Sequence, residues 1–195
     1  MDQNLLKQEI LKIHPDFSMN ELKQGLVYFE IKAFKAKDHI LKEGETCYFL
    51  YFANSSVSRC YYHDEEENEK TVWMEPEQMF ITDFESFINE YPAKYNLQLY
   101  QNTNTWMISR KNLLFLYENY KDWAFFGLKL MEKYHVRILE LFTIMFQNNA
   151  SENYHFIETN FSDFLKTAPL KDVASMLNLS PVSLSRIRAG KQTKK

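Results

Sequence analysis

The segment at residues 121–148 constrains the fold most, because it is long, lacks proline, contains one glycine and repeats apolar residues at helical spacing. A surface helix of a monomer normally has a single apolar stripe. This segment has two, so its helix must be covered on two sides, either within one chain or by its own chain and a partner. We favour a partner and predict a dimer seam; burial within one chain is the alternative. The seam is predicted to contain Phe126, Leu130, Tyr134, Ile138 and Leu141, and the second stripe contains Leu128, Val136, Leu139, Phe142 and Phe146.

The residues before this helix favour β-structure. Short runs of aromatic and β-branched residues are separated by turns, which is typical of a sandwich or barrel. Residues 64–69 are too polar to bury and are expected at a hairpin tip. Ser18 and Glu21 have the spacing of a capping box and predict the start of a short helix. Further helices are predicted at 4–14 and 112–120, and a short helical turn is predicted within 80–91. Extended segments are predicted at 29–35, 39–42, 47–53, 57–62, 71–74 and 95–109, the last with a turn at 102–104.

The segment at 169–191, PLKDVASMLNLSPVSLSRIRAGK, predicts two short helices joined by a tight turn. Ala174 is small enough for the helix crossing, Ser180 and Pro181 begin the second helix, and Gly190 ends it. This is helix-turn-helix spacing, whose second helix can enter a DNA major groove. An ordinary helical hairpin with a basic surface is the alternative. The residues predicted to contact DNA are Ser180, Pro181, Val182, Ser183, Ser185, Arg186, Arg188 and Lys191, and Ala189 is also free to point outward.

The net charge of −3 hides a division along the chain. From residue 162 onward seven Lys and Arg residues stand against two Asp, a balance of +5, whereas the rest of the chain carries −8. An acidic body with a basic C-terminal end indicates a polyanionic partner for that end. A solvated lysine tail would have the same composition.

Several classes of protein are disfavoured by residue usage. Two cysteines, Cys47 and Cys60, cannot form a disulfide scaffold or a four-cysteine metal site, and are expected as free thiols in a reducing cytoplasm. The longest apolar run is far shorter than a membrane span, and the N-terminus has no signal core. No nucleophile–base pair, glycine-rich phosphate loop or histidine ligand spacing is present. We therefore predict no enzyme activity, no metal, no cofactor and no membrane partner.

The order of a β-rich region, a long helix and a C-terminal helix-turn-helix resembles the Crp/Fnr family of transcription regulators, named for the cyclic-AMP receptor protein. The resemblance is carried by LKEGETCYFLYFANSSVSRCY at 41–61, which is similar to the opening of that family's β-roll, and by PLKDVASMLNLSPVSLSRIR at 169–188, which is similar to its DNA-binding end. It implies an α+β chain with a cyclic-nucleotide-binding-like β-roll (jelly roll) at 1–120, a dimerisation helix at 121–148 and a helix-turn-helix domain at 149–195.

The resemblance also implies a function: a homodimer that binds double-stranded DNA and senses a small-molecule effector through the β-roll. The competing hypothesis is an effector-binding or protein-interaction module whose helix-turn-helix no longer binds DNA. Two departures from the family lie in that end of the chain. Val182 replaces a glutamate common near the start of the recognition helix, and the chain stops at Lys195, too soon for a two-stranded wing. Arg186 matches the family's groove arginine.

The phosphate-binding cassette departs further. The family reads Phe-Gly-Glu and then, about ten residues on, an arginine that neutralises the phosphate. Here Thr82 stands for the glycine, Asp83 for the glutamate and Ala93 for the arginine, with Lys94 next to it. Because lysine cannot make the bidentate contact of arginine, the effector is expected not to be cyclic AMP. The degenerate effector pocket is predicted to contain Phe80, Thr82, Asp83, Phe84, Ala93, Lys94 and Tyr95.

Overall fold

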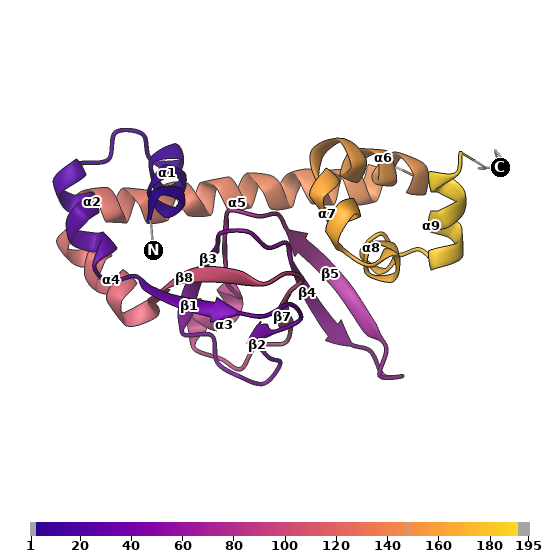
Figure 1. Ribbon diagram of the computed structural model, residues 1–195, viewed down its shortest axis with the longest axis horizontal. Helices are drawn as coiled ribbons and strands as arrows, with labels where there is room; N and C mark the ends of the chain where they lie inside the picture. The colour runs from indigo at the N-terminus through magenta and orange to yellow at the C-terminus, as the bar shows by residue number, and fades with distance from the viewer. Residues whose placement is uncertain (1–2, 148, 191–195) are drawn as a thin grey trace.

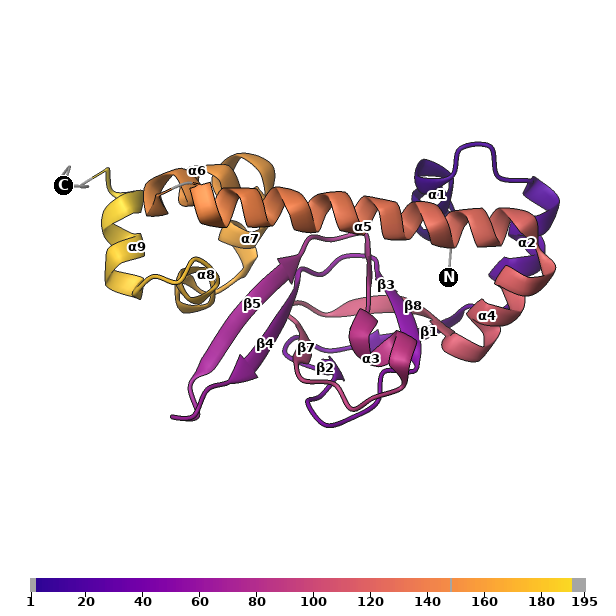
Figure 2. The same cartoon turned by 180° about the vertical axis from the view of Figure 1, so that it is seen from behind.

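The computed structural model describes residues 3–147 and 149–190, and within helix α5 (Lys121–Gln147) it describes no side chain at 141 or at 143–147. Two predicted site residues, Leu141 of the seam and Lys191 of the DNA contacts, therefore lie outside the described side chains. Helix α5 runs the length of the molecule, with the β-strands packed along one side of it (Figure 1). Seen from behind, the N-terminal helices sit at one end of α5 and the C-terminal helices at the other (Figure 2).

The β-roll consists of two four-stranded antiparallel sheets, as the sequence pattern predicted. Their strand orders are β1-β8-β3-β6 and β2-β7-β4-β5. Phe52 and Phe80 are paired across β3 and β6, and both are buried in the core between the sheets and α5. The strands are β1 (Glu30–Phe34), β2 (His39–Leu41), β3 (Phe49–Ala53), β4 (Ser58–His63), β5 (Glu69–Glu75), β6 (Met79–Ile81), β7 (Asn96–Leu99) and β8 (Thr103–Ser109).

The short helical turn predicted within 80–91 is α3 (Phe84–Asn89), and β6 occupies the start of that segment because Phe80 and Ile81 pair with β3. One local prediction in this region was wrong. The turn expected at 102–104 falls earlier, since Thr103 already pairs with Phe34 in β8. The hairpin tip between β4 and β5 is where the polar run predicted it.

Three short helices, α1 (Asn4–Ile13), α2 (Met19–Leu26) and α4 (Arg110–Asn119), pack around the N-terminal part of α5. The predicted cap is present: the Glu21 backbone N–H donates to Ser18 Oγ. Trp123 of α5 is fully buried, and its indole N–H donates to the Glu21 carbonyl oxygen at 2.9 Å. A Cβ atom placed on Gly25 would lie 2.1 Å from that indole, so glycine is needed there for α2 to pack on α5.

The face of α5 toward the β-roll corrects the predicted dimer seam. Phe126, Leu130 and Tyr134 are buried in the core of their own chain, and the Tyr134 hydroxyl donates to the Phe80 carbonyl oxygen. These three side chains have no surface left for a partner, so their assignment to a seam was wrong. Of the predicted seam residues with a described side chain, Ile138 alone is exposed. The other exposed apolar residues of α5 are Phe125, Leu128, Met131, Val136, Leu139 and Phe142.

The C-terminal helices are α6 (Ala150–Asn160), α7 (Ser162–Thr167), α8 (Leu170–Met176) and α9 (Pro181–Arg188). Their apolar core includes Phe164, Val173 and Leu184, and it continues into the β-roll through Val57 and Met74, all five of them fully buried or nearly so. The helix-turn-helix is thus packed directly against the β4–β5 side of the β-roll.

Candidate functional site

The turn between α8 and α9 has the geometry that its residues predict. Asn178 adopts a left-handed backbone with φ of 54°, which asparagine tolerates better than most residues. The Leu179 backbone N–H donates to the Ala174 carbonyl oxygen at 2.8 Å and closes the turn. Ser180 Oγ accepts the Ser183 backbone N–H at 3.1 Å, and Pro181 follows as the first helical residue. These contacts fix the direction in which α9 leaves the turn.

The outward face of α9 follows from which residues it buries. Leu184 and Ile187 face the core. At about 100° per residue, the side opposite their midpoint carries the residues at 182, 185, 186 and 189. All four are exposed, and we call them the outward face of α9: Val182, Ser185, Arg186 and Ala189.

Other predicted contact residues lie away from that face or are already engaged. The Ser183 hydroxyl lies 2.8 Å from Ser180 Oγ and is half-buried. Arg188 is exposed on the flank of the helix, beside Tyr154 of α6. Pro181 is exposed at the N-terminus of α9, next to the cap residue Ser180. The predicted DNA contacts with a described position thus divide into residues on the outward face of α9 and residues on its flank or at its cap.

A buried ionic network joins the helix-turn-helix to the β-roll. Arg59 of β4 and Asp172 of α8 are each 4% exposed, and Nη1 of Arg59 lies 3.1 Å from Oδ1 of Asp172. Arg59 also donates from Nη2 to Glu69 and from Nε to Gln98, both at 2.9 Å. The Tyr100 hydroxyl donates to Oδ2 of Asp172 at 2.9 Å. Sequence analysis missed this network because its members are far apart along the chain.

Part of the predicted effector pocket lies at a cavity of about 510 Å³, where the β-roll meets α5. Of the seven predicted residues, Thr82, Asp83, Phe84 and Tyr95 line it. The other three do not. Phe80 is in the core, and Ala93 is buried in backbone pairing with Gly44 and Glu45. Lys94 points to solvent, with its ammonium 2.6 Å from Glu85.

Two of the lining residues are already engaged by their own chain. Thr82 Oγ1 donates to the Phe49 carbonyl oxygen at 3.0 Å. The Asp83 carboxylate accepts the Ser86 backbone N–H at 3.0 Å and so caps α3. The acid that stands where the family has its ribose-binding glutamate therefore serves as a helix cap.

The strongest polar feature of the cavity comes from α5. Arg137 Nη1 lies 2.6 Å from Glu75 Oε2, and the Trp73 indole N–H donates to the other Glu75 oxygen at 2.9 Å. The guanidinium lies 5.0 Å from the centre of the Trp73 ring, a cation–π distance. Burial raises the pKa of the Glu75 carboxyl, and the charge of Arg137 opposes that shift. Arg137 Nε and Nη2 are buried without a hydrogen-bond partner. Arg137 lies three residues after Tyr134, on the inward face of α5, and this spacing is the sequence signal that could have identified Arg137 as a cavity residue.

The balance of charge in the cavity disfavours a phosphate. Its walls include two arginines, Arg59 and Arg137, and three acids, Glu75, Asp83 and Glu85. Each arginine is already paired with a carboxylate. A phosphate that displaced one of these carboxylates would leave it buried without its cation, which is costly.

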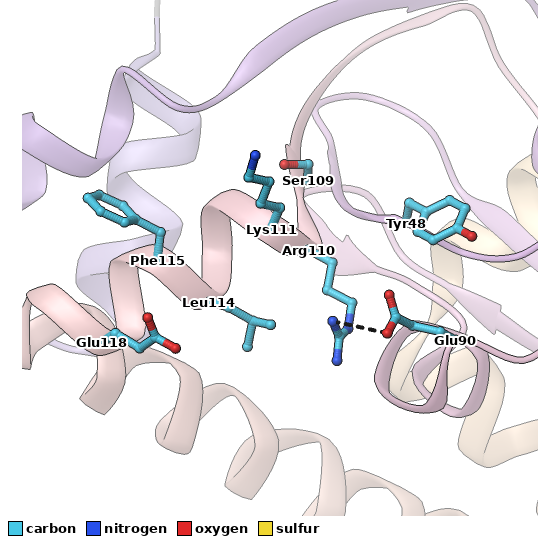
Figure 3. Close-up of a pocket in the computed structure, with 8 residues that line it drawn as sticks. All are labelled: Tyr48, Glu90, Ser109, Arg110, Lys111, Leu114, Phe115 and Glu118. Carbon is cyan, nitrogen blue, oxygen red and sulfur yellow. Dashed lines mark ion pairs between the residues drawn. The ribbon is translucent and has the colours of Figure 1, made fainter.

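A second, more open cavity of about 470 Å³ lies on the outer side of α4 (Figure 3). Arg110 reaches across it toward Glu90, 3.5 Å away, and also donates to the Ile88 carbonyl oxygen at 3.3 Å. These contacts join α4 to α3. The remaining lining residues are Tyr48, Ser109, Lys111, Leu114, Phe115 and Glu118. We assign this cavity no part in the function proposed below.

Within residues 3–147 and 149–190, no group of three or more His, Cys, Asp or Glu side chains is placed to hold a metal ion. Among the helices described, none is long and apolar enough to cross a membrane.

Solved structures of regulators and of a cyclic-nucleotide-binding domain share this fold. The c-di-GMP-responsive global regulator CLP of Xanthomonas campestris aligns with a TM-score of 0.64 at 12% identity, over 89% of this chain and 91% of CLP. A cyclic nucleotide-binding domain from Methylobacillus flagellatus aligns with a TM-score of 0.61 at 20% identity, over 71% of this chain and 81% of that domain. DNR from Pseudomonas aeruginosa aligns with a TM-score of 0.55 at 20% identity, over 97% of this chain and 88% of DNR. No protein-family model matches the sequence, and no curated protein matches it significantly. The predicted Crp/Fnr-type α+β fold is thus confirmed.

Proposed function

We propose that this chain is a DNA-binding transcription regulator of the Crp/Fnr type that acts as a homodimer. The observation that carries the proposal is the outward face of α9, which presents Arg186 to solvent beyond a capped and tightly closed turn. Arginine at such a position can make a bidentate contact with guanine in the major groove. The basic C-terminal end and the acidic body of the chain support the same partner.

The exposed side of α5 supports the homodimer. Leu128, Met131, Ile138 and Phe142 follow a spacing of three and four that continues through His135, which is the pattern of a coiled-coil seam. Leu128 is 55% exposed, and the other three are also exposed, so they form one apolar surface on a single helix. Such a surface on a protein marks an interaction site. A second copy packed here would place two recognition helices for a two-fold DNA site, whose half-sites are about 34 Å apart.

The cavity beside α5 supports effector sensing, because its wall shares residues with the attachment of the helix-turn-helix. Arg59 lines the cavity and pairs with Asp172 of α8. Trp73 lines it and packs edge-on against Phe161 and Phe164 of the C-terminal helices. A ligand that displaces either side chain would alter how α8 is held. The effector is more apolar than a cyclic nucleotide, since both arginines of the cavity are paired with carboxylates.

The test is selection of bound sequences from a random pool of duplex DNA, followed by titration of the selected site by fluorescence anisotropy at fixed salt. Arg186→Ala is expected to weaken binding to that site by about 1–3 kcal/mol. Arg110→Ala is the matched control, because it removes the same kind of side chain from α4, which packs at the N-terminal part of α5, away from α9. A dimer that enriches no sequence would contradict the proposal and favour the protein-interaction module. Reading of chromosomal DNA would place the protein in the cytoplasm, where Cys47 and Cys60 stay reduced.

A further inference from the structure

The centre of the outward face of α9 is an apolar side chain. Val182 is 61% exposed and lies opposite Leu184 and Ile187, which are buried. Arg186 lies one helical turn further along the same face. Val182 therefore contributes nothing to the core of its own domain, yet it occupies the position of α9 that is first to meet a groove entered by the N-terminal end of the helix.

We infer that Val182 reads the methyl group of a thymine in the same half-site as the guanine that Arg186 reads. This inference rests on the proposed DNA binding. Valine has no hydrogen-bond donor or acceptor on its side chain, so it cannot distinguish bases by their polar edges. Among the groups that the four bases present in the major groove, the thymine C5-methyl is apolar, and contact with it is the readout open to an apolar side chain.

The rest of the outward face adds little discrimination. Ser185 is a hydroxyl that can pair with donors or acceptors on several bases. Ser183 is held by Ser180 and lies off the face. The choice of base is thus left mainly to Val182 and Arg186.

The spacing of these two residues sets the arrangement of the bases they read. Four residues advance an α-helix by about 6 Å. Successive base pairs are separated by about 3.4 Å. The thymine is therefore expected within about two base-pair steps of the guanine in each half-site.

Removal of the methyl group alone tests the inference. In the site selected from the random pool, each thymine is replaced in turn by deoxyuridine, which keeps every hydrogen-bonding group and lacks only the C5-methyl. One thymine per half-site, within two base-pair steps of the guanine, should be sensitive to the replacement. There we expect about a fourfold loss of affinity per half-site, because burial of one methyl group contributes about that much to binding. The other thymines should tolerate the replacement.

Variants at 182 make the test specific. With Val182→Ala the penalty for deoxyuridine at that thymine should fall below twofold. Val27→Ala should leave the penalty unchanged, because Val27 is an exposed valine at the C-terminal end of α2, away from α9. Val182→Gln should shift the selected base from thymine to adenine, because glutamine pairs with the adenine N6 and N7 groups.

The outcomes separate this inference from the proposed function. If no sequence is enriched, the DNA-binding proposal itself fails. If a site is enriched and its binding depends on Arg186, but every deoxyuridine replacement binds as tightly as thymine, DNA binding stands and the thymine readout is overturned.

Discussion

Replacement of Arg59 by methionine would test how firmly the helix-turn-helix is held on the β-roll. Methionine keeps most of the volume of the side chain and removes its charge. Asp172 would then remain buried, with the Tyr100 hydroxyl as its one side-chain donor among the described residues. The Glu69 carboxylate would be destabilised less than that of Asp172, because its side chain is 33% exposed and lies 3.5 Å from the ammonium of Lys171.

The expected cost follows from these environments. Removal of one partner of a buried ion pair typically destabilises a protein by about 3–5 kcal/mol. Since Tyr100 still donates to Asp172, we expect the lower end, about 3 kcal/mol. The chain can avoid part of this cost by releasing α8 from β5, which returns Asp172 to water. A change of about 3 kcal/mol corresponds to more than a 100-fold rise in the released population.

Amide hydrogen exchange at Thr71 reports this release. The Thr71 backbone N–H donates to Ser175 Oγ of α8 at 2.9 Å, across the interface. In Arg59→Met it should exchange about 100-fold faster, and the midpoint of urea unfolding should fall. Glu69→Gln is the control, with an expected cost below about 1 kcal/mol because its carboxylate is partly hydrated.

A double variant completes the cycle. Arg59→Met combined with Asp172→Leu removes both charges, and replacement of a buried ion pair by apolar residues is often close to neutral. The double variant should therefore recover most of the stability lost by Arg59→Met. Unchanged exchange at Thr71 in the single variant, or a double variant as unstable as the single one, would refute the reasoning.

Three further predictions follow from the cavity, the long helix and the turn. Calorimetric titration with cyclic AMP should show no dissociation constant in the low micromolar range or tighter, because Arg59 and Arg137 are paired with carboxylates; tight binding would refute this. Leu128→Glu should give monomers by light scattering at micromolar concentration, while Val27→Glu should remain dimeric; a monomeric wild-type protein would end the dimer hypothesis. Ser180→Ala should lower the free energy of unfolding by about 1 kcal/mol through loss of the α9 cap, and an unchanged urea midpoint would count against the cap.

The parts of the fold that local signals determine could be predicted from the sequence. The caps at Ser18 and Ser180, the proline at the first position of α9 and the polar hairpin tip all lie within a few residues of the structure they specify. The long helix also followed from its composition: it is described over Lys121–Gln147, and the last residue of the predicted range, 148, lies outside the described residues.

The side of α5 that faces the β-roll could not be predicted in this way. Both stripes are apolar, so the period alone does not tell which one meets the sheets. Gly127 offers a signal that was not used: a Cβ atom there would lie 2.6 Å from the Tyr117 ring. A glycine inside a helix marks the side on which another element packs closely. Gly127 lies three residues before the buried Leu130.

The cavity was predicted in part for a related reason. Comparison with the family's phosphate-binding cassette covers one continuous segment of the sequence, and it therefore identified Thr82 and Asp83. Arg137 and Glu75 reach the cavity from other elements, so the comparison did not identify them. Gln78 adopts a left-handed backbone with φ of 58°, a conformation more usual for glycine, so the local residue type did not indicate this turn.

The continuous apolar core formed by Val57, Met74, Phe164 and Leu184 has a consequence for how such proteins change over time. A helix-turn-helix that shares its core with a β-roll is not an exchangeable module. Grafted onto another β-roll, it would meet a surface of different shape and lose the packing that holds α8 in place. Substitutions at Met74 and in the facing helices must therefore accumulate together, so that sequence change in the β-roll also changes the C-terminal helices.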